Sequence, residues 1–197
     1  MQPAEQDVKM RLLQAAKKLF ARQGFDGTTI RQICEEAGAN VALISYYFGG
    51  KDKIFQALLE TFFTQTVMDD ILSGEPSPVE GIRKVVKEVI LFQLREPELV
   101  RLFQMEIMMF SPRIELLRQG KFPLWHKLLH LLEQGREQGT FTFRSIDHTF
   151  SFIMSLLFDR DSTYFSPLMR EEEQTPEQLI EDMTAFILNG LMYKADS

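Results

Sequence analysis

The sequence has little that would tie the protein to an oxidising compartment or to a membrane. Its single cysteine, Cys34, has no partner within the chain for a disulfide, and its place on the apolar face of an expected helix indicates a small buried residue. No apolar run reaches the roughly 18 to 20 residues that cross a bilayer, and residues 1–7 do not resemble a signal peptide. We therefore expect a soluble protein that stays in the cytoplasm.

The residue patterns that mark many enzymes are also missing. In the place of a phosphate-binding loop, Ser45 replaces the first glycine and Asp52 the final Ser or Thr, and there is no G-x-S-x-G motif. His126 and His130 lie one turn apart, but the Glu of H-E-x-x-H and partner cysteines are absent. We interpret both as surface or pocket-lining groups. We expect no catalytic residue, no cofactor and no bound metal.

The net charge of −6 does not favour DNA binding, but this charge is unevenly divided along the chain. Residues 1–53 hold eight Lys or Arg against six Asp or Glu, net +2, whereas residues 54–197 hold fourteen against twenty-two, net −8. Phosphates are attracted by local positive charge, so a mildly basic N-terminal part on an acidic body is compatible with DNA binding.

Hydrophobic residues recur at spacings of three and four along most of the chain, which predicts an all-α protein. Residues 73–78 form the clearest linker, residues 120–123 are a weak point within one expected helix, and only residues 140–144 alternate like a strand. The expected helices are 7–23, 29–37, 41–47, 51–72, 79–95, 97–110, 113–138, 146–161 and 175–193.

Residues 28–53 read as two short helices joined by a tight turn. Thr29 and Gln32 form a capping box that starts the first helix, Gly38 ends it, and Asn40 is a good N-cap for the second. A helix, a short glycine-containing turn and a second helix form the helix-turn-helix arrangement, in which the second helix enters the major groove of DNA.

The runs T-T-I-R-Q-I, A-G-A-N-V-A and S-Y-Y-F-G-G-K-D-K-I-F resemble the N-terminal domain of the TetR family of bacterial transcriptional regulators. In that family a Thr opens the first motif helix, an aromatic pair and a Phe close the second, and a Lys begins the next. The matching residues are Thr28, Thr29, Tyr46, Tyr47, Phe48 and Lys51. The resemblance implies a three-helix DNA-binding domain, residues 1–53, and a larger helical ligand-binding and dimerisation domain, residues 54–197.

Helix geometry and the resemblance together assign contacts with double-stranded DNA. Phosphate contacts are expected from Thr28, Thr29, Tyr47 and Lys51, with helix capping as an alternative or additional role of the two threonines. Base edges are expected to face Val41, Ala42, Ser45 and Tyr46. Because Val41 and Leu43 replace more polar residues of many relatives, thymine methyl contacts and DNA shape are expected to carry more of the specificity. Arg31 is a further candidate, for a phosphate or a guanine.

The family typically couples a ligand pocket in the larger domain to the spacing of two DNA-binding heads. An apolar set is the candidate lining for a small hydrophobic effector: Phe103, Met105, Met108, Met109, Phe110, Phe122, Trp125 and Phe150. The alternative is that these Met and aromatic residues are ordinary core.

Residues 146–161 and 175–193 are more apolar than one core face requires. The resemblance implies that the last two long helices of each subunit form a four-helix dimer interface, and the candidate interface residues are Phe158, Phe186, Ile187 and Leu191. A central helix wrapped by its own subunit is the alternative. We expect a homodimeric repressor on a palindromic operator.

A second resemblance suggests a different role. The runs A-N-V-A-L-I-S-Y-Y-F-G-G-K and R-L-F-Q-M-E-I are similar to the RefZ-like regulators of Z-ring assembly, which belong to the same family. This resemblance implies a DNA-bound regulator of cell division that acts through protein partners. It is the alternative to a ligand-released repressor, since a shared fold does not determine function.

Overall fold

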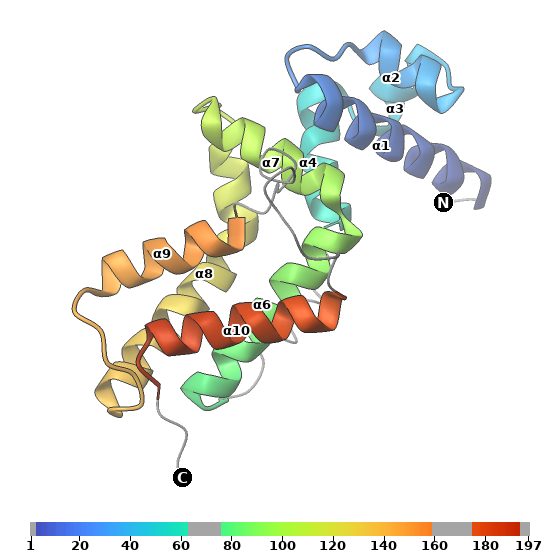
Figure 1. Cartoon of the computed structure of the whole chain (residues 1–197). Helices are drawn as coiled ribbons and strands as arrows, with labels where there is room; N and C mark the ends of the chain where they lie inside the picture. Colours follow the sequence, from blue (N-terminus) through green and yellow to red (C-terminus); the bar gives the residue numbers. More distant parts are fainter. Residues whose placement is uncertain (1–2, 63–75, 159–174, 194–197) are drawn as a thin grey trace, which may run out of the picture. The chain divides into compact units, whose positions relative to one another are not determined.

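The computed structural model describes residues 3–62, 76–158 and 175–193, and within them the side chains of all but residues 3–5 and 119–123. All regular structure in these ranges is helical, which confirms the all-α prediction (Figure 1). The helices are α1 (Pro3–Gln23), α2 (Ile30–Ala37), α3 (Val41–Tyr47), α4 (Lys51–Phe62), α6 (Pro78–Arg95), α7 (Pro97–Met108), α8 (Ile114–Glu137), α9 (Ile146–Phe158) and α10 (Pro176–Gly190).

The predicted boundaries of α2 and α3 are confirmed because the capping residues act as expected. Thr29 and Gln32 exchange both bonds of a capping box at the start of α2. Gly38 ends that helix in the left-handed region, with φ of 61°, where a Cβ would be strained. Thr175 forms a second capping box at the start of α10.

Several helix ends differ from the prediction: α1 begins at Pro3, α7 ends at Met108 and α10 ends at Gly190. α8 runs without a break through the predicted weak point at residues 120–123, with the buried Leu117 and Leu124 on either side of it. The strand-like residues 140–144 are irregular. The expected continuations over residues 63–72 and 159–161 lie outside the described residues.

The helices are divided between two compact units. Unit 1 contains α1 to α4, α7 and α8 up to residue 121; unit 2 contains α6, the rest of α8, α9 and α10. α7 is therefore grouped with the N-terminal helices, although more than thirty residues separate it from α4. The functional division at residue 53 stays a prediction.

In unit 1, α1 contacts α2, α4 and α7. The Phe20 ring of α1 lies 5.1 Å from that of Phe25, which in turn meets Phe55 of α4 edge-on at 5.6 Å. About one turn earlier on α1, Lys17 Nζ lies 2.9 Å from a carboxylate oxygen of Glu96, the residue before α7, and both side chains are largely buried. Apolar packing and an ion pair thus join α7 to the N-terminal helices.

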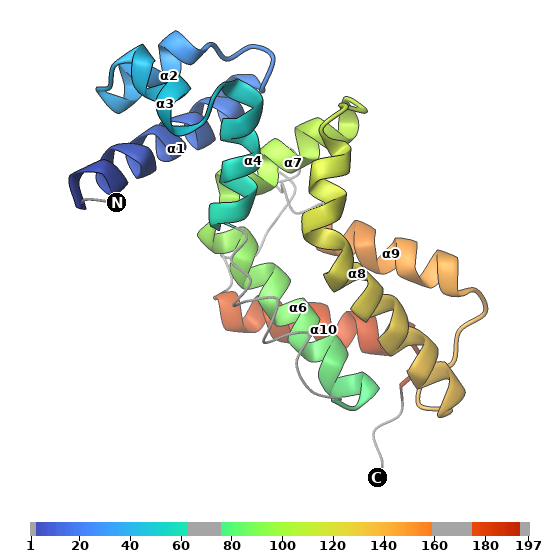
Figure 2. The same cartoon turned by 180° about the vertical axis from the view of Figure 1, so that it is seen from behind.

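In unit 2, α6 packs against α10 and α9. Figures 1 and 2, taken from opposite sides, show α10 in front of α6 and then behind it. Gly81 allows α6 to approach α8 closely, since a Cβ at this position would lie 2.4 Å from a methyl carbon of Leu131. The fully buried core of this unit includes Ile82, Val85, Ile90, Leu128, Leu132 and Phe141. None of the described helices is both long enough and apolar enough to span a bilayer.

Candidate nucleic-acid interface

α3 presents one side to the protein and the other to solvent. Ile44 is fully buried and fastens the helix to unit 1. The four residues that were predicted to face base edges, Val41, Ala42, Ser45 and Tyr46, are all exposed, and Tyr46 is the most exposed of the large ones at 72%. An exposed mixed face of a short helix can approach the edges of base pairs in a major groove.

The start of α3 is held by its cap. The Asn40 side-chain oxygen accepts a hydrogen bond from the backbone N–H of Ala42 at 2.9 Å. At the other end, the backbone N–H groups of Phe48 and Gly49 both donate to the carbonyl of Ile44, and Gly49 is in the left-handed region with φ of 79°. These bonds give a seven-residue helix defined ends, which it needs because so short a helix has little stability of its own.

The start of α2 is also exposed. Thr29 is exposed, and its hydroxyl accepts the backbone N–H of Gln32. Arg31 is also exposed and pairs with Glu35 one turn later, at 3.1 Å. Such a surface ion pair is worth little, so a DNA phosphate can compete for the arginine.

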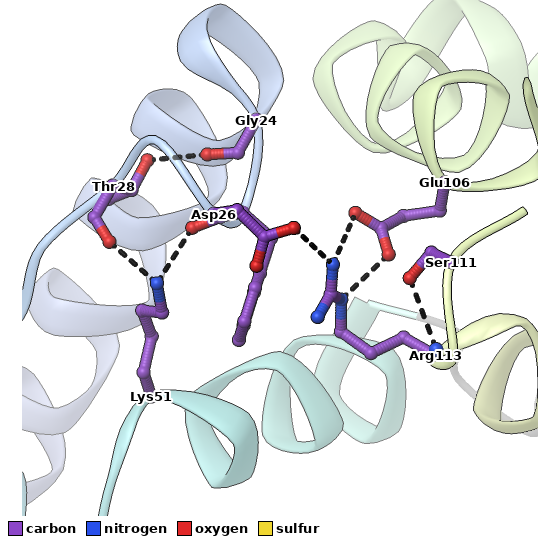
Figure 3. A network of polar contacts seen from close by, with 8 residues as sticks. Gly24, Asp26, Thr28, Lys51, Glu106, Ser111 and Arg113 are labelled. Carbon is purple, nitrogen blue, oxygen red and sulfur yellow. Dashed lines mark hydrogen bonds and ion pairs between the residues drawn. The ribbon is translucent and has the colours of Figure 1, made fainter. Parts of the chain in front are cut away.

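Thr28 and Lys51 are engaged with the protein itself in this structure, and their direct contacts with phosphate stay a prediction. Thr28 is buried, and its hydroxyl donates to the carbonyl of Gly24 at 2.7 Å. The Lys51 ammonium donates to the carbonyls of Phe25 and Thr28, at 2.9 and 2.8 Å. Both residues therefore close the segment between α1 and α2, residues 24–29, which we call the 24–29 turn (Figure 3).

Arg113, just before α8, contacts the same turn and was not singled out by the sequence. Its guanidinium bonds to Glu106 of α7, with Nε to Oε2 at 2.7 Å, and to Asp26 of the 24–29 turn, with Nη2 to Oδ2 at 3.2 Å. Burial lowers the pKa of Arg113, but Glu106 and Asp26 more than offset this and hold it above its ordinary value. No local motif indicates this cluster, because Asp26 and Arg113 are 87 residues apart.

The remaining predicted phosphate contact, Tyr47, is partly buried at the end of α3. Its ring meets the Tyr46 ring edge-on at a centroid distance of 4.9 Å and lies 6.3 Å from the Phe48 ring. Tyr47 thus lies between the exposed helix face and the body of unit 1, which is compatible with a contact at the edge of a groove.

The predicted effector set is divided between the two units. Phe103 is buried in unit 1, and the Cε of Met105 is close to Gly24. Met108, Met109 and Phe110 are exposed at the end of α7, between 77% and 88%. In unit 2, Trp125 and Phe150 are partly buried against the core, and Trp125 lies 5.5 Å from Phe158. Phe122 lies outside the residues with described side chains. Neither unit gathers the whole set.

Gln93 of α6 has an unusual environment. Its side-chain N–H donates to the carbonyl of Leu157 on α9. Its amide oxygen is buried, and no donor among the described residues reaches it. A buried polar atom without a partner is uncommon and needs an explanation.

The predicted dimer residues occupy two kinds of position. Ile187 and Leu191 are buried within the core of unit 2, whereas Phe186 is 66% exposed on α10 and Phe158 is partly exposed at the end of α9. Phe152 of α9, which the sequence did not single out, is also exposed. The buried pair explains some of the apolar excess of α10 without a second subunit.

No group of three His, Cys, Asp or Glu side chains among the described residues is arranged to hold a metal ion. Cys34 is buried in α2, as predicted, and burial, with a smaller contribution from the Glu35 charge, raises the pKa of its thiol above the ordinary value. The thiolate is therefore disfavoured at neutral pH.

A capped helix-turn-helix with an exposed second helix, joined to a larger helical body, is the architecture of a DNA-binding regulator. Residues 12–58 match the family described as "Bacterial regulatory proteins, tetR family", and residues 78–185 match "Tetracyclin repressor-like, C-terminal domain". The chain belongs to the TetR family of bacterial transcriptional regulators.

Known proteins resemble this chain over most of its length. The probable HTH-type transcriptional regulator YttP of Bacillus subtilis is 27% identical over 157 residues, which cover 76% of this chain and 74% of YttP. The HTH-type transcriptional repressor NicS of Pseudomonas putida is 28% identical over 153 residues, which cover 75% and 72%.

Solved structures share the fold over nearly the whole chain. HlyIIR, a hemolysin II transcriptional regulator, has a TM-score of 0.76 and 26% identity, with 96% of this chain and 99% of HlyIIR covered. The ketosteroid transcriptional regulator KstR2 of Mycobacterium tuberculosis has a TM-score of 0.73 at 23% identity, with 95% of both chains covered. The second likeness concerns the fold alone.

Proposed function

We propose that this protein is a homodimeric repressor that binds a palindromic DNA operator through α2 and α3 and is released by a small hydrophobic effector. The observation that carries the DNA-binding part is the exposed face of α3, opposite the buried Ile44. The net charge of +2 in residues 1–53, on a chain of net −6, favours approach to DNA by this end. The names of NicS and other relatives as repressors support the regulatory role.

On DNA, the α3 face would supply the base contacts and its surroundings the phosphate contacts. Val41 and Ala42 suit the thymine methyl group, while the Ser45 hydroxyl and Tyr46 can make polar or stacking contacts with base edges. Thr29 and Arg31 suit phosphates beside the groove. The partner is DNA, so the place of action is the bacterial cytoplasm and no catalytic step is required.

Dimerisation through α9 and α10 is the simplest use of the exposed aromatic residues in unit 2. Phe152 and Phe186 are each about two-thirds exposed. Large apolar side chains of this kind are usually covered in the assembled protein. Two copies related by a two-fold axis would present two α3 helices to the two halves of a palindrome.

The region around Gln93 is the best candidate for effector binding. Its amide oxygen has no partner among the described residues, and its amide N–H bonds to the carbonyl of Leu157 on α9, a helix whose Phe150 and Met154 are only partly buried against the core of unit 2. A mostly apolar molecule with one hydrogen-bond donor would satisfy both features. Thermal unfolding with a series of such compounds tests this: stabilisation of the wild-type protein but not of Gln93→Leu is expected.

The central experiment selects genomic fragments from the source organism with the purified protein and sequences them. Recovery of a palindrome near its own gene or a transporter gene is expected for a ligand-released repressor. Enrichment of no sequence would reject the proposed DNA-binding role. Sites scattered away from promoters would instead favour the division-linked alternative, which the relatives reported above do not support.

A pair of variants makes the selection specific to α3. Tyr46→Ala removes an exposed ring that has no role in the core, so the fold should persist while operator affinity falls about tenfold, the loss of one good base contact. Leu94→Ala removes another exposed apolar side chain, at the end of α6, and should bind as the wild type does. Equal binding by all three proteins would contradict base contact by Tyr46.

A further inference from the structure

Two positively charged side chains contact the 24–29 turn from opposite sides. Lys51 Nζ lies 4.3 Å from the centroid of the Phe25 ring, and the Arg113 guanidinium carbon lies 3.8 Å from the same centroid. One ring face cannot hold both groups at these distances, so the ring lies between them, and Figure 3 shows Lys51 and Arg113 on either side of the turn. Lys51 belongs to α4, but Arg113 lies far outside the helix-turn-helix sequence.

We propose that Arg113 is a positioning residue for DNA binding: it holds the 24–29 turn, and through the turn the first residues of α2, in the arrangement that DNA requires. This inference rests on the DNA-binding function proposed above. Arg113 itself does not touch DNA in this proposal. It acts through the first residues of α2, which are exposed and are predicted to contact DNA.

The Arg113 side chain and its backbone are both held in place by neighbouring residues. The Arg113 side chain is 11% exposed, and that of Glu106, its partner on α7, is 5% exposed. The backbone N–H of Arg113 also donates to the Ser111 hydroxyl, at 3.1 Å, so its main chain is held as well as its guanidinium. Glu106 accepts hydrogen bonds from one edge of the Arg113 guanidinium group. A further N–H of this group donates to Asp26, and its flat face packs against the Phe25 ring.

A second set of bonds transmits the position of the turn to α2. Lys51 bonds to the carbonyls at the two ends of the segment from Phe25 to Thr28, and the Thr28 hydroxyl returns to Gly24. The next residue is Thr29, the N-cap of α2. The Thr29 hydroxyl and the N–H groups at the start of α2 are the groups that would meet a phosphate. A shift of Phe25 or Asp26 therefore displaces this phosphate site.

The test measures binding of the selected operator and of an unrelated duplex over a range of salt concentrations. Arg113→Ala should weaken operator binding about tenfold but change binding of the unrelated duplex less than about twofold, because charge-driven binding does not need a well-placed α2. The slope of log affinity against log salt should stay the same, because the displaced groups at the start of α2 are uncharged, whereas loss of a phosphate contact made by the Arg113 charge would reduce it by roughly one.

Arg118→Ala is the matched control. Arg118 lies on α8, is exposed and pairs with Glu115 one turn earlier, so this variant removes the same charge without changing a contact of the 24–29 turn. It should bind the operator as the wild type does. Operator binding by Arg113→Ala that equals that of Arg118→Ala would overturn the proposal, and so would a reduced salt slope, which would make Arg113 a direct phosphate contact.

Arg113→Lys keeps the charge but lacks the planar fork, and it serves if Arg113→Ala does not fold. It should lose operator affinity by about threefold to tenfold with an unchanged salt slope, and wild-type affinity in a folded Arg113→Lys would also overturn the proposal. Failure of the wild-type protein to select any DNA would reject the proposed function instead. The two results are therefore distinguishable.

Discussion

At the residue scale, side chains next to the expected DNA surface have separate structural duties. Ile44 anchors α3, Asn40 caps it, and the Thr28 hydroxyl stabilises the 24–29 turn. Val41, Ser45 and Tyr46 have no comparable duty and are exposed. Substitutions in the first group should affect stability and binding together, whereas those in the second should affect binding alone.

Two substitutions of Asn40 separate an effect on stability from an effect on DNA binding. Asn40→Ala removes the acceptor for the N–H of Ala42, so the free energy of unfolding should fall by about 1 kcal/mol, the typical value of an N-cap. Asn40→Asp keeps the acceptor and should preserve stability, but its new charge should weaken DNA binding most at low salt. Denaturant unfolding and binding titrations measure both; equal stability of the two variants would contradict the capping role.

Cys34 predicts a dependence of stability on alkaline pH. Burial raises the pKa of its thiol in the folded state, so in the window between the ordinary and the raised pKa the unfolded chain loses a proton that the folded chain keeps. Deprotonation then favours unfolding, and stability should fall as pH rises through this window. In Cys34→Ala that component should vanish, leaving a shallower decline; parallel curves for the two proteins would contradict the prediction.

At the scale of elements, close packing limits which helix residues can change. Gly81 of α6 lies against Leu131 of α8, and Gly135 of α8 lies against the Phe141 ring. In each case a neighbouring side chain fills the space that a Cβ on the glycine would occupy. Gly190, at the end of α10, has nothing within 4 Å of where its Cβ would be. Glycines of similar helical context thus have different roles.

Gly81→Ala and Gly190→Ala form a matched pair for this difference. Alanine is the better helix former at both positions, so intrinsic preference favours both changes by up to about 1 kcal/mol. At position 81 the clash with the buried Leu131 should reverse the sign and lower the free energy of unfolding by about 1 to 3 kcal/mol. Chemical denaturation of the two variants checks this, and stabilisation by Gly81→Ala would contradict it.

At the scale of the whole molecule, the sequence predicted local features well and long-range ones poorly. The caps at Thr29, Asn40 and Thr175 depend on neighbours within three residues, so their patterns are readable. The cluster of Arg113 with Asp26 requires a known tertiary fold. The exposure of Phe110 and the burial of Leu191 were not predictable for the same reason, because apolar periodicity marks a face without saying what covers it.

The proposed dimer gives a prediction at this scale. Phe186→Glu places a charge on an exposed residue, so the subunit should fold but remain monomeric, and binding of a full palindrome should weaken strongly while a half-site is bound as before. Light scattering and operator titration measure this outcome.

Two further variants show whether the effect is specific. Leu94→Glu, an equal charge at an exposed position on α6, should leave the protein dimeric. Leu191→Glu should instead unfold unit 2, because Leu191 is buried in its own core. A Phe186→Glu protein that remains dimeric would rule out an interface that buries Phe186.

The position of Arg113 also bears on protein engineering. A chimera made by grafting residues 1–53 onto the body of another regulator would carry Asp26, Phe25 and Lys51, but it would leave Arg113 and Glu106 behind. The transplanted DNA-binding domain would then keep its recognition residues but only one of the two charged side chains that hold the 24–29 turn. A transferable module from this protein should therefore include the segment from α7 to the first turn of α8, or a host that supplies an arginine in its place.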